Sequence, residues 1–299
     1  MRKIPEKLYP FEAHYHDIGG LRMHYLDEGE GPLVLMVHGN PTWSFYYRNL
    51  VQALRPGHRC IVPDHIGCGF SDKPGEDRYE YRLDRRIEDL DSLMSKILGE
   101  NPAGKSIDLV VHDWGGLIGL GWAVRHPELI RRIVIFNTAA FHLPSGKEVP
   151  WQLRLARNSA FGVFIVRAFN AFACGATRVA MRAHPMPPEI RRAYCAPYDS
   201  WENRIATARF VQDIPLDPGD PGYETISAVS EGLGAFQKTP VMICWGEKDF
   251  VFDHHFREEF QRRWPQAGVH SFAEAGHYVL EDAAAEILPL VTGFLSGSN

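Results

Sequence analysis

The sequence has little of what several broad functional classes require. Its five cysteines are an odd number without a C-x-x-C pair, so we expect neither a disulfide framework nor a zinc site, which fits a reducing cytoplasm. Basic residues are slightly outnumbered, with 32 Lys and Arg against 37 Asp and Glu. The formal net charge of −5 leaves no basic footprint, so nucleic acid is not an expected partner.

Long hydrophobic runs are also missing. The first residues are charged and lead into no apolar run, so the sequence predicts no signal peptide. The longest apolar stretches, around residues 108–124 and 160–176, are interrupted by Asp113 and Arg167, so we expect no membrane span and no membrane partner. The 299 residues can instead bury a large core as one domain, or as a core with an insertion.

Short apolar runs alternate with helix-like segments along most of the chain. A hairpin is predicted at residues 12–28, where two alternating segments meet at Gly19 and Gly20. Further strands are predicted at residues 32–37, 60–63, 107–111, 130–136, 241–245 and 269–273, and helices at 45–54, 81–98, 114–124 and 282–294. This alternation predicts an α/β protein with a mostly parallel eight-stranded sheet and helices on both faces.

The alternation stops between residues 142 and 222. This segment is rich in Arg, Phe, Ala and Met and contains helix-like stretches but no clear buried strand. We therefore predict a helical cap domain at residues 142–222, lying across the mouth of any pocket. Residues 1–141 and 223–299 would form the core domain.

One stretch has the pattern of a sharp turn between a strand and a helix. Residues 107–111 are rich in β-branched side chains, and residues 114–124 are apolar and helix-like. Asp113 stands between them without room for a loop, and Gly115 and Gly116 let the backbone pass closely. This arrangement is typical of a nucleophile elbow, with Asp at the position of the usual Ser. An Asp that only caps the helix gives the same local pattern, so the stretch alone leaves both interpretations open.

Polar residues follow four of the predicted strands. They are Asn40, Asp113, Asp249 and His277. Ligand sites in open parallel sheets lie beyond the carboxyl ends of the strands, so we expect these side chains to meet there. The last three follow the chain order nucleophile, acid, histidine, which is the order of an α/β-hydrolase triad. Their joint occurrence favours a catalytic site over unrelated caps and turns.

An aspartate nucleophile predicts a particular chemistry. A carboxylate is already ionised at neutral pH, so Asp113 needs no base to attack a saturated carbon and form an alkyl ester. His277 would then activate a water that hydrolyses the ester, with Asp249 orienting the ring. The backbone N–H groups of Asn40 and Trp114 are expected to form the oxyanion hole.

The residues beside the nucleophile indicate the leaving group. A halide released into an apolar pocket needs hydrogen-bond donors in place of water. The indole N–H of Trp114 and the side-chain amide of Asn40 supply such donors, so we expect these two residues to bind halide. For Trp114, packing in the core is the alternative interpretation.

Five motifs resemble those of the haloalkane dehalogenases. They are H-G-N-P-T-W-S at 38–44, D-H-I-G-C-G-F-S-D-K-P at 64–74, H-D-W-G-G at 112–116, W-G-E-K-D at 245–249 and A-G-H at 275–277. The resemblance covers the core and implies an α/β-hydrolase fold with an inserted cap. It implies hydrolysis of the carbon–halogen bond of haloalkanes to a primary alcohol, halide and a proton, with Asp113 as nucleophile and His277 as base. The implied partners are a small apolar halogenated substrate, halide and water, with no cofactor and no metal.

The resemblance also bears on the catalytic acid. In one subgroup of the family a Glu follows the sixth strand, but here residues 136–140 hold no carboxylate, so Asp249 is the expected acid. The combination of Asn40 and Asp249 is most similar to a third subgroup, whose members tend to self-associate. Homo-oligomer formation is therefore one expectation for this chain.

Epoxide hydrolases share the Asp–His–Asp arrangement and remain the alternative. They use cap tyrosines to protonate the epoxide oxygen, and Tyr194 and Tyr198 stand at an i, i+4 interval in the predicted cap. Fluoroacetate-type dehalogenases use an Arg near the elbow, where this chain has Trp114. A serine esterase is disfavoured because Ser44 and Ser71 lie in turns. A catalytically inactive scaffold would need a broken triad, and every member is present.

Several apolar residues either line a pocket or belong to the core. Core packing is expected for at least half of Phe141, Phe161, Phe164, Phe172, Phe210 and Val251. Trp151 and Trp201 are weak candidates for a halide contact and are expected mainly to pack. Apart from His277, the histidines are expected to be structural or exposed, with His38 bracing the oxyanion loop.

Overall fold

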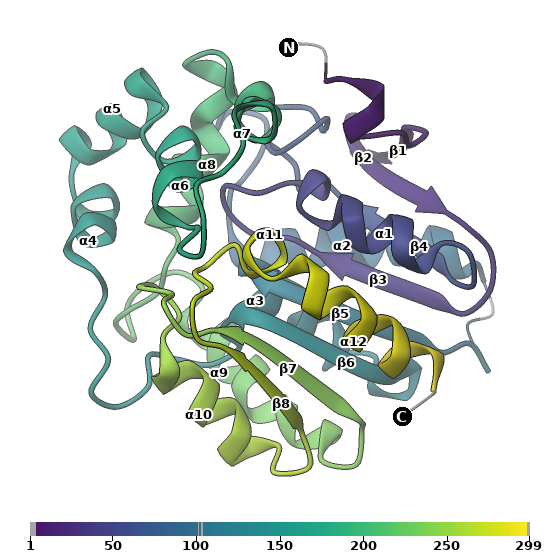
Figure 1. The fold of residues 1–299 in the computed structure, drawn as a ribbon. Helices are drawn as coiled ribbons and strands as arrows, with labels where there is room; N and C mark the ends of the chain where they lie inside the picture. Colours follow the sequence, from purple (N-terminus) through teal and green to yellow (C-terminus); the bar gives the residue numbers. More distant parts are fainter. Residues whose placement is uncertain (1–3, 101, 103, 298–299) are drawn as a thin grey trace.

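A computed structural model describes residues 4–100, 102 and 104–297 of the chain (Figure 1). Its centre is one eight-stranded sheet with the strand order β1-β2-β4-β3-β5-β6-β7-β8. The strands are β1 (His14–Ile18), β2 (Leu21–Glu28), β3 (Leu33–Val37), β4 (Arg59–Pro63), β5 (Ile107–Asp113), β6 (Ile130–Thr138), β7 (Val241–Gly246) and β8 (Gly268–Phe272). Strand β2 pairs antiparallel with β1 and β4, and all other pairs are parallel. The predicted α/β fold with a mostly parallel sheet is confirmed.

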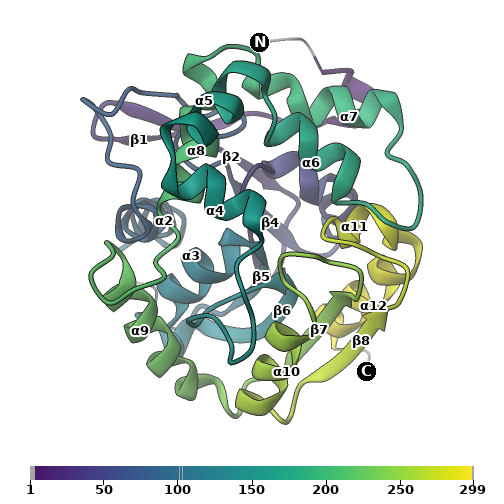
Figure 2. The same ribbon diagram turned by 90° about the vertical axis from the view of Figure 1, so that its left-hand side faces the viewer.

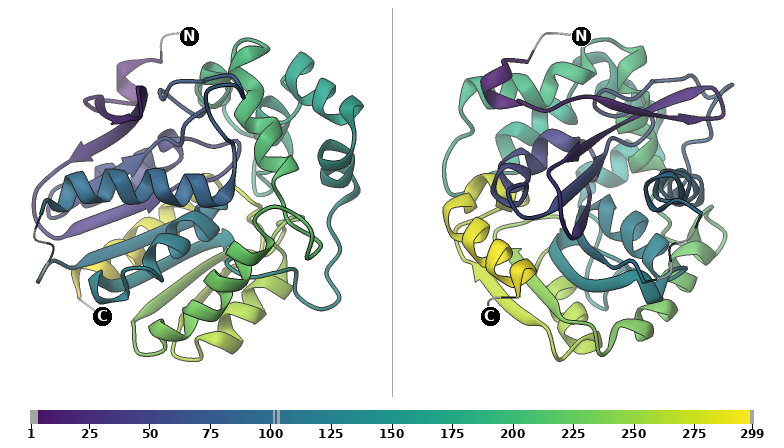
Figure 3. Two further views of the ribbon diagram at one scale, coloured as in Figure 1. Left: turned by 180° about the vertical axis from the view of Figure 1, so that it is seen from behind. Right: turned by 90° about the vertical axis from the view of Figure 1, so that its right-hand side faces the viewer.

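Helices cover both faces of the sheet (Figures 1 and 3). On one face lie α1 (Arg48–Leu54), α11 (Val279–Asp282) and α12 (Ala284–Ser296), and on the other α2 (Leu83–Leu98), α3 (Trp114–Ala123), α9 (Tyr223–Gly232) and α10 (His254–Arg263). All seven residues of β5 are buried. Leu109 and Val111 belong to the core under α2 and α3, whereas Val110 belongs to the core under α1 and α12. This explains why the strand is a continuous apolar run rather than an alternating one.

Three helices and strands differ from the prediction at their boundaries. The helix predicted at 45–54 begins as a 3₁₀ turn, Ser44–Tyr47, and becomes α-helical at Arg48. Strand β5 runs beyond the predicted end to Asp113, because its pairing with β6 continues as far as Asp113 and Thr138. The last helix is divided into α11 and α12 at Ala283, whose ψ of 28° lies outside the helical range.

Five helices lie between β6 and α9, beyond the carboxyl ends of the central strands (Figure 1). These cap helices are α4 (Trp151–Asn158), α5 (Ala160–Phe169), α6 (Ala173–Val179), α7 (Pro188–Cys195) and α8 (Ile205–Gln212). All residues of this segment are described, and none forms a strand. Helix α9 packs back on α3. The boundaries 142–222 stay a prediction.

One prediction about the cysteines is wrong. A disulfide joins Cys174 of α6 to Cys195 of α7, whose Cα atoms are 5.6 Å apart. Helices α6 and α7 pack against each other, a proximity that the spacing of cysteines in the sequence does not show. Cys60, Cys68 and Cys244 are free and buried.

The described residues contain no single helix that is both long and apolar enough to cross a membrane. Helices α5 and α6 together reach that length and apolarity, but they are bent by 83° at the break between them.

Candidate active site

The turn between β5 and α3 has the geometry of an elbow. Asp113 has φ 53° and ψ −130°, a conformation that residues other than glycine rarely adopt and that is held here by the surrounding structure. A Cβ atom on Gly115 would collide with the carbonyl of Val37, and one on Gly116 with the hydroxyl of Thr138. Glycine is therefore required at both positions for α3 to pack this closely on the sheet.

Asp113, Asp249 and His277 come together at the carboxyl edge of the sheet. The Nδ1 atom of His277 lies 2.8 Å from Oδ2 of Asp249, and its Nε2 atom lies 3.4 Å from Oδ2 of Asp113. All three side chains are at least nine-tenths buried. The structure thus assembles the three residues that the sequence predicted as a triad, from β5 and from the loops after β7 and β8.

The two carboxylates control the charge of His277. Burial alone would lower the pKa of His277, but the charges and hydrogen bonds of Asp249 and Asp113 outweigh burial and raise it to about 10. The imidazole is therefore protonated at neutral pH. His112 fixes the backbone beneath the ring, because its Nε2 lies 2.8 Å from the carbonyl oxygen of His277. Burial holds the pKa of His112 well below its ordinary value, so this second imidazole is neutral.

Asn40 contacts both Asp113 and the cap. Its backbone N–H donates to Oδ1 of Asp113 at 2.5 Å, and its role in the oxyanion hole stays a prediction. Its side-chain amide donates to the carbonyl of Thr207 in α8 at 3.1 Å. Trp114, 8% exposed, lines the cavity above the elbow and packs on Phe210 with ring centroids 5.3 Å apart. The roles of Asn40 and Trp114 as halide ligands, and of the Trp114 backbone N–H in the oxyanion hole, stay predictions.

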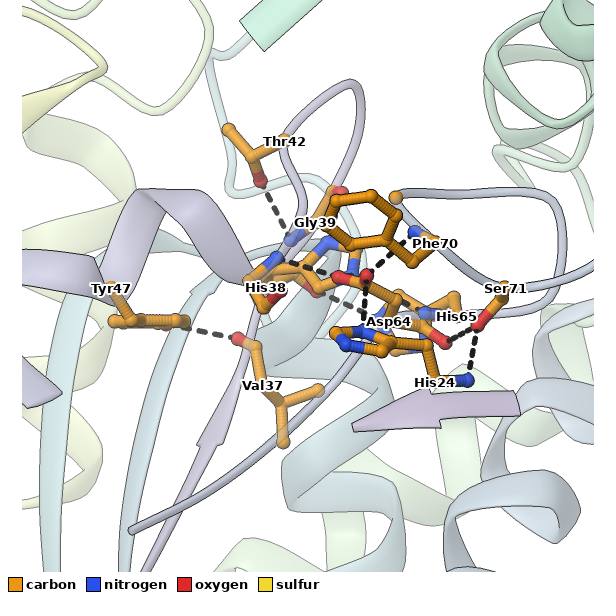
Figure 4. Close-up of polar contacts among 12 residues, drawn as sticks. His24, Val37, His38, Gly39, Thr42, Tyr47, Asp64, His65, Phe70 and Ser71 are labelled. Atoms are coloured by element: carbon orange, nitrogen blue, oxygen red, sulfur yellow. Dashed lines mark hydrogen bonds and ion pairs between the residues drawn. The ribbon is translucent and has the colours of Figure 1, made fainter. Parts of the chain in front are cut away.

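A buried polar network supports the loop that carries Asn40 (Figure 4). His38 Nδ1 lies 2.7 Å from the carbonyl of Gly39, and its Nε2 accepts the backbone N–H of His65 at 3.3 Å. Asp64 lies 2.8 Å from Nδ1 of His24. Burial would raise the pKa of Asp64, but His24, His38 and the backbone N–H of Ser44 outweigh it and hold that pKa below its ordinary value. The contact of His38 with this loop agrees with the bracing expected from the sequence.

Sequence reasoning missed a residue that holds the loop of Asp249. Asn137, at the end of β6, donates to the carbonyls of Gly246 and Phe252 at 3.0 and 3.2 Å and accepts the N–H of Gly246 at 2.8 Å. The sequence showed only that residues 136–140 lack a carboxylate. A buried Asn directly after a buried strand was the available indication, since its amide needs partners.

Asp113 and His277 line a cavity of about 580 Å³. Most of its lining is apolar, and α4, α6 and the loops after β6 and β7 contribute to it. Of the six predicted apolar residues, Phe141, Phe172 and Val251 line the cavity. Phe161 and Phe164 are exposed on the cap, and Phe210 is buried behind Trp114.

Four other cap residues lie outside this cavity. Trp151 is exposed, and Trp201 packs against Phe164 with ring centroids 5.9 Å apart. The Tyr194 hydroxyl donates to Oε1 of Glu281 at 2.5 Å, and that of Tyr198 to the carbonyl of Thr42 at 3.3 Å. Neither tyrosine hydroxyl points at Asp113, which weakens the epoxide hydrolase alternative.

One group among the described residues has the spacing of metal ligands. Ligand atoms of Asp253, His254 and His255 lie within 4.8 Å of one another at the start of α10. The ammonium of Lys147 lies 2.8 Å from Oδ2 of Asp253, and a cation next to this carboxylate disfavours a metal ion.

Comparison with known proteins identifies one fold family and relatives with two different named activities. The family model described as alpha/beta hydrolase fold matches residues 32–284. The chain is 51% identical over 291 residues to a cis-3-alkyl-4-alkyloxetan-2-one decarboxylase of Shewanella oneidensis, covering 97% of this chain and 90% of the relative. It is 33% identical to a haloalkane dehalogenase of Mycobacterium marinum, covering 93% and 92% of the two chains. The crystal structure of a haloalkane dehalogenase from Bradyrhizobium elkani superposes with a TM-score of 0.82 at 26% identity, covering 96% and 98% of the two chains.

Proposed function

Because the chain belongs to the α/β-hydrolase fold family and is related to the haloalkane dehalogenases, we propose that Asp113 attacks a saturated carbon and that the substrate is a cis-3,4-dialkyl oxetan-2-one. The observation that carries the proposal is the protonated His277, whose Nε2 lies 3.4 Å from the Asp113 carboxylate in a mostly apolar cavity. The identity of 51% to an oxetanone decarboxylase supports this substrate class over haloalkanes.

The first step opens the four-membered ring. The Asp113 carboxylate attacks C4 from the side opposite the ring oxygen, a C–O bond to Asp113 forms, and the bond between C4 and the ring oxygen breaks. The ring oxygen becomes part of a carboxylate attached to C3. Ring strain favours this step, and His277 can donate a hydrogen bond to the new carboxylate as its charge develops.

The second step releases carbon dioxide. The bond between C3 and the carboxylate carbon breaks, its electron pair forms the double bond between C3 and C4, and the bond from C4 to Asp113 breaks. The products are an alkene, carbon dioxide and the free Asp113 carboxylate. Backside attack places Asp113 opposite the departing carboxylate, so the elimination is anti and a cis lactone gives a cis alkene. Neither water nor a base is consumed.

The cavity suits a substrate with two alkyl chains. Its volume of about 580 Å³ lies within the ~300–1,000 Å³ range of sites for drug-sized ligands and exceeds what a short haloalkane needs. The donors that the sequence predicts for halide, the Trp114 indole and the Asn40 amide, suit the carboxylate formed on ring opening equally well.

Hydrolytic dehalogenation is the second candidate, because the indole of Trp114 lines the cavity on the residue next to the nucleophile. In that reaction Asp113 displaces halide and becomes a neutral ester. His277 then loses the carboxylate that helps raise its pKa, so it can release its proton and activate water.

A parallel assay of three substrates tests the proposal. The purified protein is incubated with a cis-3,4-dialkyl oxetan-2-one, a bromoalkane and a cis epoxide of equal carbon number. We expect cis alkene from the oxetanone, followed by gas chromatography and mass spectrometry, and at least 100-fold lower kcat/KM for halide release. Rapid halide release without alkene would overturn the proposal in favour of the second candidate, and diol formation would favour epoxide hydrolysis.

A further inference from the structure

Large apolar side chains are exposed mainly on one part of the molecule. Ten are exposed among the described residues: eight lie within residues 142–222, Phe250 lines the cavity, and only Tyr15 lies elsewhere. We call the exposed residues of α4, α5 and the turn before α8 the outer cap face: Trp151, Leu155, Phe161, Phe164, Phe169 and Trp201. Large apolar side chains exposed together on neighbouring elements typically mark an interaction site.

Three rings of the outer cap face form one cluster around Phe164. Phe164 lies against Phe169 and Trp201, with ring centroids 6.1 and 5.9 Å apart. The guanidinium carbon of Arg167 lies 4.4 Å from the ring centroid of Trp201. Helices α4 and α5 pack together and lie in front of the sheet in Figure 2. Helix α4 turns Gln152 and Leu153 toward the cavity and leaves Trp151, 69% exposed, outside.

The charge of this region differs from that of the rest of the chain. Residues 149–188 contain five arginines and no acidic residue, a net charge of +5 in a chain of net −5, which leaves −10 for the remainder. Arg157 is paired with Asp220 of the same cap, and Arg154 with Glu148 at its edge. Arg178, on the last turn of α6, is exposed.

We infer that the outer cap face binds the surface of an anionic lipid bilayer. Trp, Phe and Leu on one side of short helices, flanked by Arg, are typical of helices that lie in the membrane interface. The arginines complement the negative charge of the lipid headgroups. Protein interfaces also favour Trp, Phe and Arg, so a protein partner is the outcome that the vesicle experiment distinguishes from lipid binding.

Helix α4 carries residues of both the outer cap face and the cavity lining. Leu143, Val179 and Phe250 are exposed and also line the cavity, so its rim is apolar. An apolar substrate dissolved in the bilayer could pass to Asp113 with little contact with water. The inference revises the expectation of no membrane partner, which rested on the lack of a span and took no account of exposure on the cap. The inference rests on the proposed function only in taking the substrate to be apolar. The binding experiment contains no substrate, so its result does not depend on that function.

The experiment is flotation of the full chain with vesicles of phosphatidylcholine, with and without 30% phosphatidylglycerol. We expect binding to the anionic vesicles at 50 mM salt and loss of binding at 0.5 M salt. Arg154→Gln with Arg178→Gln should weaken binding roughly 30-fold, about fivefold per arginine. Phe161→Ser with Phe169→Ser should weaken it more than about tenfold.

Matched variants lie outside the cap. Arg78→Gln with Arg125→Gln removes two exposed charges, and Tyr15→Ser removes the exposed ring that lies elsewhere, so both should bind as the wild type does. Absence of binding at 50 mM salt would overturn the inference. So would equal weakening by the control variants, or self-association through the outer cap face without vesicle binding, measured by sedimentation.

Discussion

The Nε2 atom of His277 lies 3.4 Å from Oδ2 of Asp113, and the imidazole ring lies between the carboxylates of Asp113 and Asp249. In this position the imidazole stays protonated at neutral pH, because the two carboxylates raise its pKa against the effect of burial. The free protein therefore holds an acid, rather than a base, beside Asp113. His277 becomes a base only when an intermediate on Asp113 removes the charge of that carboxylate. The intermediate must also persist until the imidazole has released its proton.

This relationship predicts how stability depends on pH. Since the pKa of His277 is raised from its ordinary 6.5 to about 10, the protonated ring stabilises the fold fully below pH 6.5. That contribution is lost as the pH rises from 6.5 through about 10. The difference in free energy of unfolding between the wild type and His277→Gln, measured by urea denaturation, should shrink over this window. A constant or growing difference would contradict the assigned protonation.

The same residue separates the two candidate reactions. With a bromoalkane, His277→Gln should accumulate an alkyl ester on Asp113, because water is no longer activated. With an oxetanone no water is needed, so we expect slower turnover but no trapped product. Peptide mass spectrometry after digestion measures the ester. An accumulating adduct from the oxetanone would show that its breakdown needs the histidine as a base.

Glycine at position 115 is required by the elbow. A Cβ on this residue would collide with the carbonyl of Val37, so Gly115→Ala should destabilise the protein by about 3 kcal/mol. Gly234→Ala is the control, because nothing lies within 4 Å of its added Cβ. Its change should stay below about 1 kcal/mol. Thermal unfolding compares the two, and equal effects would refute the packing argument.

Asn137 is expected to act through the position of Asp249. Asn137→Ala removes three buried hydrogen bonds to the segment 246–252, so it should cost about 1–3 kcal/mol and lower kcat more than it changes KM. The exposed Asn158→Ala serves as the control for stability. A loss of stability without any change in kcat would limit Asn137 to a structural role.

The sequence predicted the sheet and the elbow because short-range patterns encode both. Apolar runs fix the central strands, and the small residues after Asp113 leave few alternatives to a sharp turn. The order of Asp113, Asp249 and His277 along the chain sufficed to place them together, since parallel strands bring their carboxyl ends to one edge.

Other features depended on contacts between distant segments. The pairing of Cys174 with Cys195 follows from the packing of two cap helices. Phe172 lines the cavity whereas Phe161 and Phe164 face outward, and helical spacing alone does not show which side of the cap meets the core. The charge of His277 results from two carboxylates, one at the end of β5 and one in the loop after β7.

The central claim is that the carboxylate of Asp113 bonds to the substrate. The most direct test compares alkene formation from a cis-3,4-dialkyl oxetan-2-one by the wild type, Asp113→Asn and Asp108→Asn. Asp108 is a buried carboxylate near the other end of the same strand, paired with Arg131, so its variant controls for damage to β5. We expect cis alkene from the wild type and Asp108→Asn, and at least a 1,000-fold lower rate from Asp113→Asn. Alkene formation by Asp113→Asn at a rate near that of the wild type would contradict the account.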